Sequence, residues 1–433
     1  MRMTMFLMPF FLAGCASHEP PVGLLGAYAF EDGRTVSIRR SVDDTLRYRV
    51  FESGDSGRLY PSEDGSFVSG PGFSQRDPVD LRVRFVTEDQ GVADQLKWSR
   101  RDTPEITANR IGREEHVWID SDGARLYGRL HLPDGKPPYA AVVLVQGSGD
   151  DPGTEWLYNG DFFVASGFAV LVYDKRGSGQ SEGEFTFNFE QLADDAGVVA
   201  RYLAEHVEID PDRVGLVGYS QGGWVAPLAA SRHDVVGFVI VNYGMIESPA
   251  EEAQMEMRQL LIDAGVAGEA LESGDELIRA AVNLVINKFE SGWPRFLELK
   301  KKYRDADWIK HLDGTPVGKL VAYPRWLIRL IGKRQLPPRL DWHYSSHELL
   351  LQSEIPMAWL LAEDDTSAPN EQTIATLRSL IAQGKPHSMT VFPDADHGMV
   401  VLHNDDGEID VAGYAPGYFQ AEVDELRRLA SEN

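Results

Sequence analysis

Ser220 is the residue whose local sequence most clearly indicates a role in catalysis. It is the third residue of the sequence Gly-Tyr-Ser-Gln-Gly (218–222), which comes directly after the apolar run 214–217. A Gly-x-Ser-x-Gly sequence between a strand and a helix makes a sharp turn that exposes the serine hydroxyl, and its glycines avoid a clash of Cβ atoms. We therefore interpret Ser220 as a nucleophile. The alternative is a glycine-rich helix start that the serine caps.

A base and an acid are needed beside such a serine, because its hydroxyl is a poor nucleophile at neutral pH. His397 comes shortly after the apolar run 389–392, and the acidic residues Glu363, Asp364 and Asp365 come shortly after the run 357–361. Each of these positions lies where a strand is predicted to end. We assign His397 as the base and Asp365 as the acid that orients it, with Asp364 or Glu363 as alternatives for the acid.

Backbone N–H groups are required to stabilise the negative charge that develops on a carbonyl oxygen under attack. One is expected from Gln221, the residue after the nucleophile. The second is expected from Ser148, in the turn Gln-Gly-Ser-Gly (146–149) that follows the apolar run 140–145. A plain glycine turn or a phosphate-binding loop is a weaker interpretation, because the Lys-Ser/Thr ending of such loops is missing.

The elements that must position these residues follow an α/β pattern. Short continuous apolar runs, typical of strands buried on both faces, alternate with longer segments of helical character. Two amphipathic strands, near 117–119 and 126–132, come before them. The predicted buried strands are 140–145, 168–173, 214–217, 235–241, 357–361 and 389–392, and the predicted helices are 189–205, 221–231, 370–382 and 418–430. The pattern predicts a doubly wound, mostly parallel sheet of the α/β class.

Two further regions precede or interrupt this pattern. Residues 23–113 alternate polar and apolar side chains in short stretches between Asp-Gly and Ser-Gly turns. They predict a small β-rich domain, with a structural or docking role rather than a second active site. Within the α/β domain, 114–433, the alternation stops at about 245–350, where helix-favouring residues predict a helical cap over the functional edge of the sheet.

The N-terminus has the layout of an export signal. One arginine precedes the apolar run 5–12, which is too short to span a bilayer and is followed by small residues. The end of this segment, Leu-Ala-Gly-Cys (12–15), resembles the processing box of bacterial lipoproteins, which implies that Cys15 is lipidated and that residues 16–22 form a tether. An ordinary signal peptide (1–15) with an incidental cysteine is the alternative. By the same resemblance, Ala16 favours an outer-membrane location that faces the periplasm.

Composition limits the partners of the protein. The net charge of −25 repels a phosphate backbone, so nucleic acid is disfavoured as a partner. Residues 295–340 are the exception, with twelve Lys or Arg against four Asp or Glu. This basic stretch has three interpretations: a solvated helical face, a surface that binds anionic lipid head groups with the help of Trp326 and its apolar neighbours, or an attractor for an anionic acyl substrate.

From about residue 114 to residue 433 the chain resembles the α/β-hydrolase superfamily, and within it the serine esterase, thioesterase and dipeptidyl-peptidase-like branches. The matching stretches are the turn 146–149, the sequence Tyr-Asp-Lys-Arg-Gly-Ser-Gly-Gln-Ser (173–181), the Ser220 turn, Asp365 and His397. The resemblance implies acyl transfer with neither a metal nor an organic cofactor. Gln146 stands where many relatives have His, and Ala362 stands where many have Gly.

The resulting hypothesis is a serine hydrolase that cleaves a carboxylic ester of a small-molecule acyl substrate through an acyl-enzyme. A thioesterase, acyltransferase or peptidase with the same three residues is the first alternative, because the shape of the pocket decides between them. A binding protein that retained the fold without catalysis is the second, since a fold by itself does not imply an activity.

Overall fold

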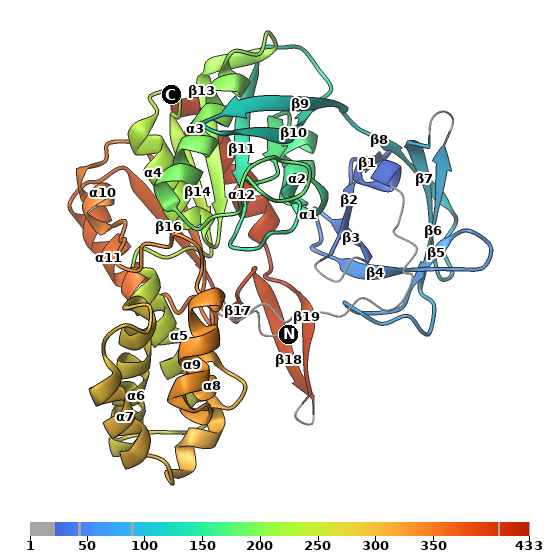
Figure 1. The fold of residues 1–433 in the computed structure, drawn as a ribbon. Helices are drawn as coiled ribbons and strands as arrows, with labels where there is room; N and C mark the ends of the chain where they lie inside the picture. The colour runs from blue at the N-terminus through green and yellow to red at the C-terminus, as the bar shows by residue number, and fades with distance from the viewer. Residues whose placement is uncertain (1–21, 42–44, 88–90, 406–407, 433) are drawn as a thin grey trace.

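The chain folds into three parts that are visible in Figure 1: a small β-barrel, an α/β domain and a helical cap inserted into that domain. The structure, a computed structural model, describes residues 22–41, 45–87, 91–405 and 408–432. The predicted signal segment and Cys15 lie outside this range. The predicted fold class, a β-rich domain followed by a doubly wound α/β sheet with a cap, is confirmed. Among the described helices, none is both long and apolar enough to cross a membrane.

The β-rich domain is a closed antiparallel barrel. Its first strand pairs with its last, with Tyr28 opposite Arg110. Side chains such as Ile38 and Leu96 are fully buried inside it, as the period-two pattern requires. Its strands are β1 (Gly26–Phe30), β2 (Thr35–Arg40), β3 (Leu46–Val50), β4 (Ser56–Pro61), β5 (Phe67–Ser69), β6 (Leu81–Thr87), β7 (Ala93–Arg100) and β8 (Ile106–Arg110).

The α/β domain is built on an eight-stranded sheet of order β16-β15-β14-β13-β11-β12-β10-β9. All neighbours from β16 to β12 are parallel, and β10 and β9 add an antiparallel edge. The strands are β9 (Arg113–Ser121), β10 (Ala124–Leu132), β11 (Tyr139–Val145), β12 (Ala169–Tyr173), β13 (Ile209–Tyr219), β14 (Phe238–Asn242), β15 (Met357–Ala362) and β16 (His387–Phe392). The shared direction of the six parallel strands brings their carboxyl ends to one edge.

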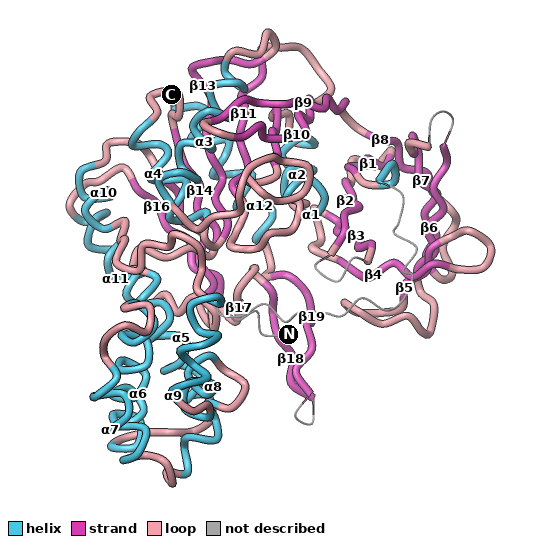
Figure 2. Tube along the Cα trace, viewed as in Figure 1, coloured by secondary structure: helices cyan, strands magenta, loops and turns pink. Residues whose placement is uncertain are grey.

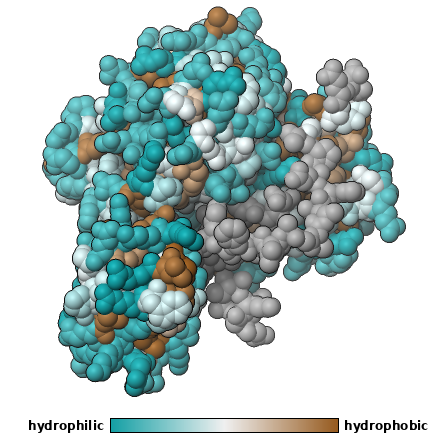
Figure 3. All heavy atoms as spheres, viewed as in Figure 1, coloured by the Kyte–Doolittle hydropathy of each residue, from teal (hydrophilic) through white to brown (hydrophobic). Residues whose placement is uncertain are grey.

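The cap joins β14 to β15 and is almost wholly helical (Figure 2). It has an apolar core of its own, in which Leu277, Phe296 and Leu312 are fully buried. Apolar side chains also reach its outer surface (Figure 3). Its helices are α5 (Pro249–Asp263), α6 (Glu269–Ile286), α7 (Trp293–Lys302), α8 (Pro316–Ala322) and α9 (Arg325–Ile331), with 3₁₀ turns at Asp307–Leu312 and Gly332–Gln335. The next helix, α10 (His347–Gln352), belongs to the α/β domain, in whose core its Leu350 is buried.

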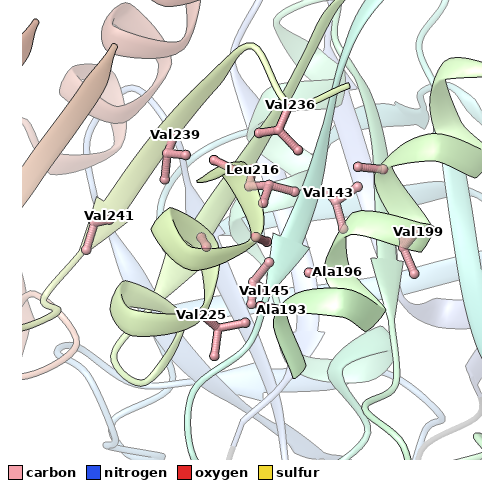
Figure 4. Packing of buried hydrophobic residues seen from close by; sticks show 14 of the residues in the cluster. Val143, Val145, Ala193, Ala196, Val199, Leu216, Val225, Val236, Val239 and Val241 are labelled. Atoms are coloured by element: carbon pink, nitrogen blue, oxygen red, sulfur yellow. The ribbon is translucent and has the colours of Figure 1, made fainter. Parts of the chain in front are cut away.

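Helices cover both faces of the sheet. On one face, α3 (Phe189–Ala204), α4 (Gly222–Arg232) and α11 (Glu371–Ala382) pack on alternate strand residues. Figure 4 shows this packing, with Val143 and Leu216 of the sheet facing the helices. On the other face lie α1 (Gly153–Trp156), α2 (Asn159–Ala165) and α12 (Tyr418–Glu432). Burial on both faces explains the continuous apolar runs in the sequence.

A buried ion pair joins the barrel to the α/β domain. Arg39 of β2 donates from Nε and Nη2 to the carboxylate of Asp161 in α2, at 2.9 and 2.6 Å, and both side chains are almost fully buried. The hydroxyl of Ser37 donates to the same carboxylate at 2.6 Å. A second contact places the Arg49 guanidinium 3.9 Å from the ring centre of Tyr158. The barrel is therefore held against the α/β domain by buried polar groups.

Replacing Asp161 by alanine is expected to lower the free energy of unfolding by about 3–5 kcal/mol, because Arg39 would remain buried without its carboxylate. Urea unfolding followed by circular dichroism measures this. Asp32→Ala, which removes an exposed partner of Arg34, is the matched control and is expected to leave stability unchanged. An Asp161→Ala protein as stable as the wild type would contradict the role given to this pair.

Candidate functional site

Ser220 lies on a strained turn between β13 and α4. Its φ angle is 52°, in the left-handed region that L-residues rarely adopt. A Cβ atom on Gly218 would lie 2.3 Å from the carbonyl oxygen of Gly222, and one on Gly222 would lie 2.4 Å from that of Val145. Both glycines are therefore required by close packing around the turn. The N–H of Ser220 donates to the carbonyl of Asn242 at 3.0 Å, which ties the turn to the next strand.

Ser220, His397 and Asp365 form one hydrogen-bonded network, although they are far apart along the chain. His397 Nε2 lies 3.1 Å from Ser220 Oγ, and His397 Nδ1 lies 2.9 Å from Asp365 Oδ2. The other carboxylate oxygen of Asp365 accepts hydrogen bonds from the N–H groups of Ser367 and Ala368, at 3.1 and 2.7 Å. The acid is thus fixed from two sides while it orients the imidazole.

The structure also distinguishes between the three acidic residues of this loop. The Asp365 side chain is fully buried against His397, whereas Glu363 and Asp364 are exposed. Their N–H groups donate to the carbonyls of Phe392 and Ala395, and this pairing lets only the third residue turn inward.

The electrostatic setting of His397 suits a proton acceptor. Burial by itself lowers the pKa of His397, but the charge and hydrogen bond of Asp365 outweigh it, so the pKa lies above its ordinary value of 6.5. Asp396 and Glu256 raise this pKa further. Asp396 also accepts hydrogen bonds from the N–H and hydroxyl of Thr366, at 2.8 and 3.0 Å, and so joins the two loops that carry the acid and the base.

The turn 146–149 lies against the nucleophile. A Cβ atom on Gly147 would lie 3.3 Å from the Cβ of Ser220, a tight contact, so glycine lets this turn lie close to Ser220 without strain. Gln146 closes the turn, since its Nε2 donates to the carbonyls of Gly149 and Asp151 at 3.4 and 3.2 Å. Within the described part of the chain, the N–H groups of Ser148 and Gln221 donate to no other residue. Both N–H groups are therefore available to a further hydrogen-bond acceptor.

Lys175 holds this turn from behind and was not singled out from the sequence. Its side chain is buried, and its Nζ donates to the carbonyl of Gly147 at 2.7 Å. In a trans peptide the carbonyl and the next N–H point in opposite directions, so Lys175 fixes the Ser148 N–H on the side away from itself. Burial lowers the pKa of Lys175 to about 7. The neighbouring Asp174 and Arg176 hold the loop after β12 that carries Lys175. Asp174 accepts a hydrogen bond from the hydroxyl of Thr154 at 2.9 Å, and Arg176 donates to Asp195 at 2.6 Å.

Tyr243 is a second residue that sequence reasoning missed. It follows β14 with a φ angle of 39°, and its ring lies 5.0 Å from that of His397 in an edge-to-face arrangement. Its N–H donates to the carbonyl of Leu360 at 2.8 Å. The available signal was its position directly after a buried strand, at the same edge of the sheet as Ser220.

Two hollows lie where α5 faces the loop of Asp365, with volumes of about 190 and 400 Å³. Among the charged side chains that line them, carboxylates such as Glu256, Asp263 and Asp313 outnumber the one arginine, Arg258. The described basic residues at 325, 329 and 333 line neither hollow. The basic stretch 295–340 contributes His311, Asp313, Gly314 and Thr315 to the smaller hollow, but none of its Lys or Arg residues lines either space.

Residues 142–410 match the sequence model of the alpha/beta hydrolase family. Since the match covers more than half of the chain, the protein belongs to the α/β-hydrolase family, whose enzymes are hydrolases.

Three curated proteins illustrate the range of relatives. The chain is 24% identical to the thiohydrolase aneE of Aspergillus aculeatus over 296 residues, which are 66% of this chain and 87% of that protein. It is 28% identical to the esterase EstD of Thermotoga maritima over 156 residues, 34% of this chain and 37% of EstD. It is 30% identical to human dipeptidyl peptidase 8 over 136 residues, 28% of this chain and 15% of that protein. The last two matches span less than half of the relative.

Replacing Lys175 by methionine is expected to lower kcat about 10-fold with little change in KM, because the peptide that carries the Ser148 N–H loses its anchor. Steady-state kinetics with a nitrophenyl ester measure both constants. The rise of kcat/KM with pH is expected to stay in place, because it follows deprotonation of His397, whose raised pKa lies above 6.5. Lys385→Met, which removes a partner of Glu354 elsewhere, is the control. Wild-type kcat in Lys175→Met would contradict the role of Lys175.

Proposed function

We propose that the protein is a serine hydrolase that cleaves carboxylic esters through an acyl-enzyme. The hydrogen-bonded network Ser220–His397–Asp365 carries this proposal: Ser220 Oγ lies 3.1 Å from His397 Nε2, and His397 Nδ1 lies 2.9 Å from Asp365 Oδ2. The strained turn at Ser220 and the two free N–H groups of Ser148 and Gln221 support it, because acyl transfer needs all of these parts near one carbonyl carbon.

In the first step His397 Nε2 takes the hydroxyl proton of Ser220 while Oγ attacks the ester carbonyl. Asp365 holds the imidazole in the tautomer with Nε2 free and stabilises the imidazolium that forms. The negative charge on the carbonyl oxygen rests on the N–H groups of Ser148 and Gln221. The ester C–O bond then breaks, His397 protonates the leaving alkoxide, and the alcohol departs.

In the second step water replaces the alcohol. His397 takes a proton from water, the hydroxide attacks the acyl carbon, and the bond to Ser220 breaks as the imidazolium returns its proton to Oγ. The products are a carboxylic acid and the free enzyme. No group besides the described side chains and water is needed to balance either step.

A thioester is the second candidate substrate. The same attack expels a thiolate instead of an alkoxide, and the relative with the widest coverage among those named above is a thiohydrolase. An acyltransferase or peptidase would use the same residues with a different acceptor or leaving group. A series of matched oxygen and sulfur esters of one acyl group ranks these bonds by kcat/KM.

Ser220→Ala is expected to lower kcat on nitrophenyl esters by about 10,000-fold or more, since the nucleophile is lost while the fold is kept. Ser148→Ala is the matched control: its N–H, not its hydroxyl, is proposed to stabilise the oxyanion, so activity should remain. Nitrophenyl release across increasing acyl lengths gives both measurements. Equal turnover by Ser220→Ala and wild type would overturn the proposal, and failure of a fluorophosphonate probe to label Ser220 would favour a binding protein.

We also propose that the protein is an exported bacterial lipoprotein, anchored through Cys15 in the outer membrane and facing the periplasm. The apolar run 5–12 and the sequence Leu-Ala-Gly-Cys (12–15) support this. Cys15→Ser is expected to abolish lipid attachment, seen by mass spectrometry of the N-terminal peptide, and to move the protein from the membrane fraction to the periplasm. Unchanged membrane association of Cys15→Ser would contradict the anchor.

A further inference from the structure

The short helix α9 presents an apolar face to solvent on the outside of the cap. Trp326 is 66% exposed and Leu330 is 61% exposed, and residues four apart lie on the same side of a helix. Tyr323, just before the helix, is 37% exposed. Ile328 points the other way and is almost fully buried in the cap core, which holds the helix in place. Figure 3 shows apolar side chains at the surface of the cap around α9.

Cationic side chains border this apolar face. Arg325 and Arg329 each precede one of its exposed apolar residues, and Arg334 follows shortly after; all are exposed. None of these arginines forms an ion pair with a residue in the described ranges, whereas Lys333 pairs with Glu290 at 2.7 Å. The stretch 295–340 contains twelve Lys or Arg and four Asp or Glu, although the whole chain carries −25. This surface is thus locally positive on a strongly negative protein.

We propose that the α9 face, defined by Tyr323, Arg325, Trp326, Arg329 and Leu330, docks on an anionic lipid bilayer. Tryptophan beside aliphatic side chains suits the boundary between head groups and acyl chains, and a border of cations suits negative head groups. Because the whole chain carries −25, much of its surface is repelled by such head groups, whereas the locally positive α9 face is attracted to them. The cap would therefore lie on the membrane and the α/β domain above it.

Vesicle co-sedimentation tests this proposal with the protein lacking residues 1–21, so that no lipid anchor contributes. Every strand and helix described above lies between Val22 and Glu432, so this truncation removes none of them. Binding is expected to vesicles that contain phosphatidylglycerol and to be much weaker with phosphatidylcholine alone. It should weaken as salt rises, because screening shortens the reach of the charges.

Two variants separate the contributions. Arg325→Gln with Arg329→Gln is expected to weaken binding about 5-fold per arginine, from the usual attraction of a basic residue near an anionic surface. Trp326→Ser with Leu330→Ser is expected to abolish co-sedimentation at low protein concentration. Trp118→Ser is the matched control, since Trp118 on β9 is 45% exposed and the arginine over its ring, Arg125, is paired with Glu182. Thermal unfolding and ester hydrolysis in solution should match wild type in all three.

Three results would overturn the proposal: no binding to anionic vesicles, equal binding to both vesicle types, or equal losses in Trp118→Ser and the α9 variants. An acidic protein would then be the next partner to test for the α9 face. The outcome is independent of the proposed esterase, since vesicle binding is measured without substrate and remains interpretable in Ser220→Ala.

Discussion

The strained turn at Ser220 is the feature around which the candidate site is built. A φ angle of 52° at a serine costs of the order of 1–3 kcal/mol and persists only where its surroundings fix it. Behind the turn, the buried Glu422 of α12 accepts hydrogen bonds from Tyr219 and Asn242, at 3.0 and 2.9 Å. Burial raises the pKa of Glu422 to about 7, against the effect of these hydrogen bonds. This network fixes the ends of β13 and β14 and thereby supports the strained serine between them.

The parallel strands bring the other residues of the candidate site to the same place as Ser220. The turns after β11, β13, β14, β15 and β16 meet at one edge of the sheet because these strands run in the same direction. For this reason the candidate catalytic residues, each of which follows a predicted strand, could be expected to lie near one another without knowledge of any contact. The same direction explains why Tyr243, which has no catalytic signature in the sequence, lies against His397.

The features that depend on the local sequence pattern could be predicted from the sequence. Buried strands gave apolar runs and the nucleophile turn gave its glycines, so Ser220 and His397 were placed beside each other correctly in space. Closure of the barrel was not predictable, because it depends on the distant contact of β1 with β8. Asp365 was assigned as the acid from its position, but Asp364 and Glu363 remained alternatives because the pairing of this loop with the end of β16 is also a distant contact. Lys175 was missed because a lysine is ordinarily exposed, and only the structure shows it buried on Gly147.

Charge is unevenly distributed over the cap, and this distribution favours one of two interpretations of the basic stretch. The hollows beside Asp365 are lined by carboxylates such as Glu256 and Asp263, which would repel an anionic acyl group. The arginines at 325 and 329 lie exposed on α9 and line neither hollow. The basic residues are thus better placed to act on an external surface than on the substrate.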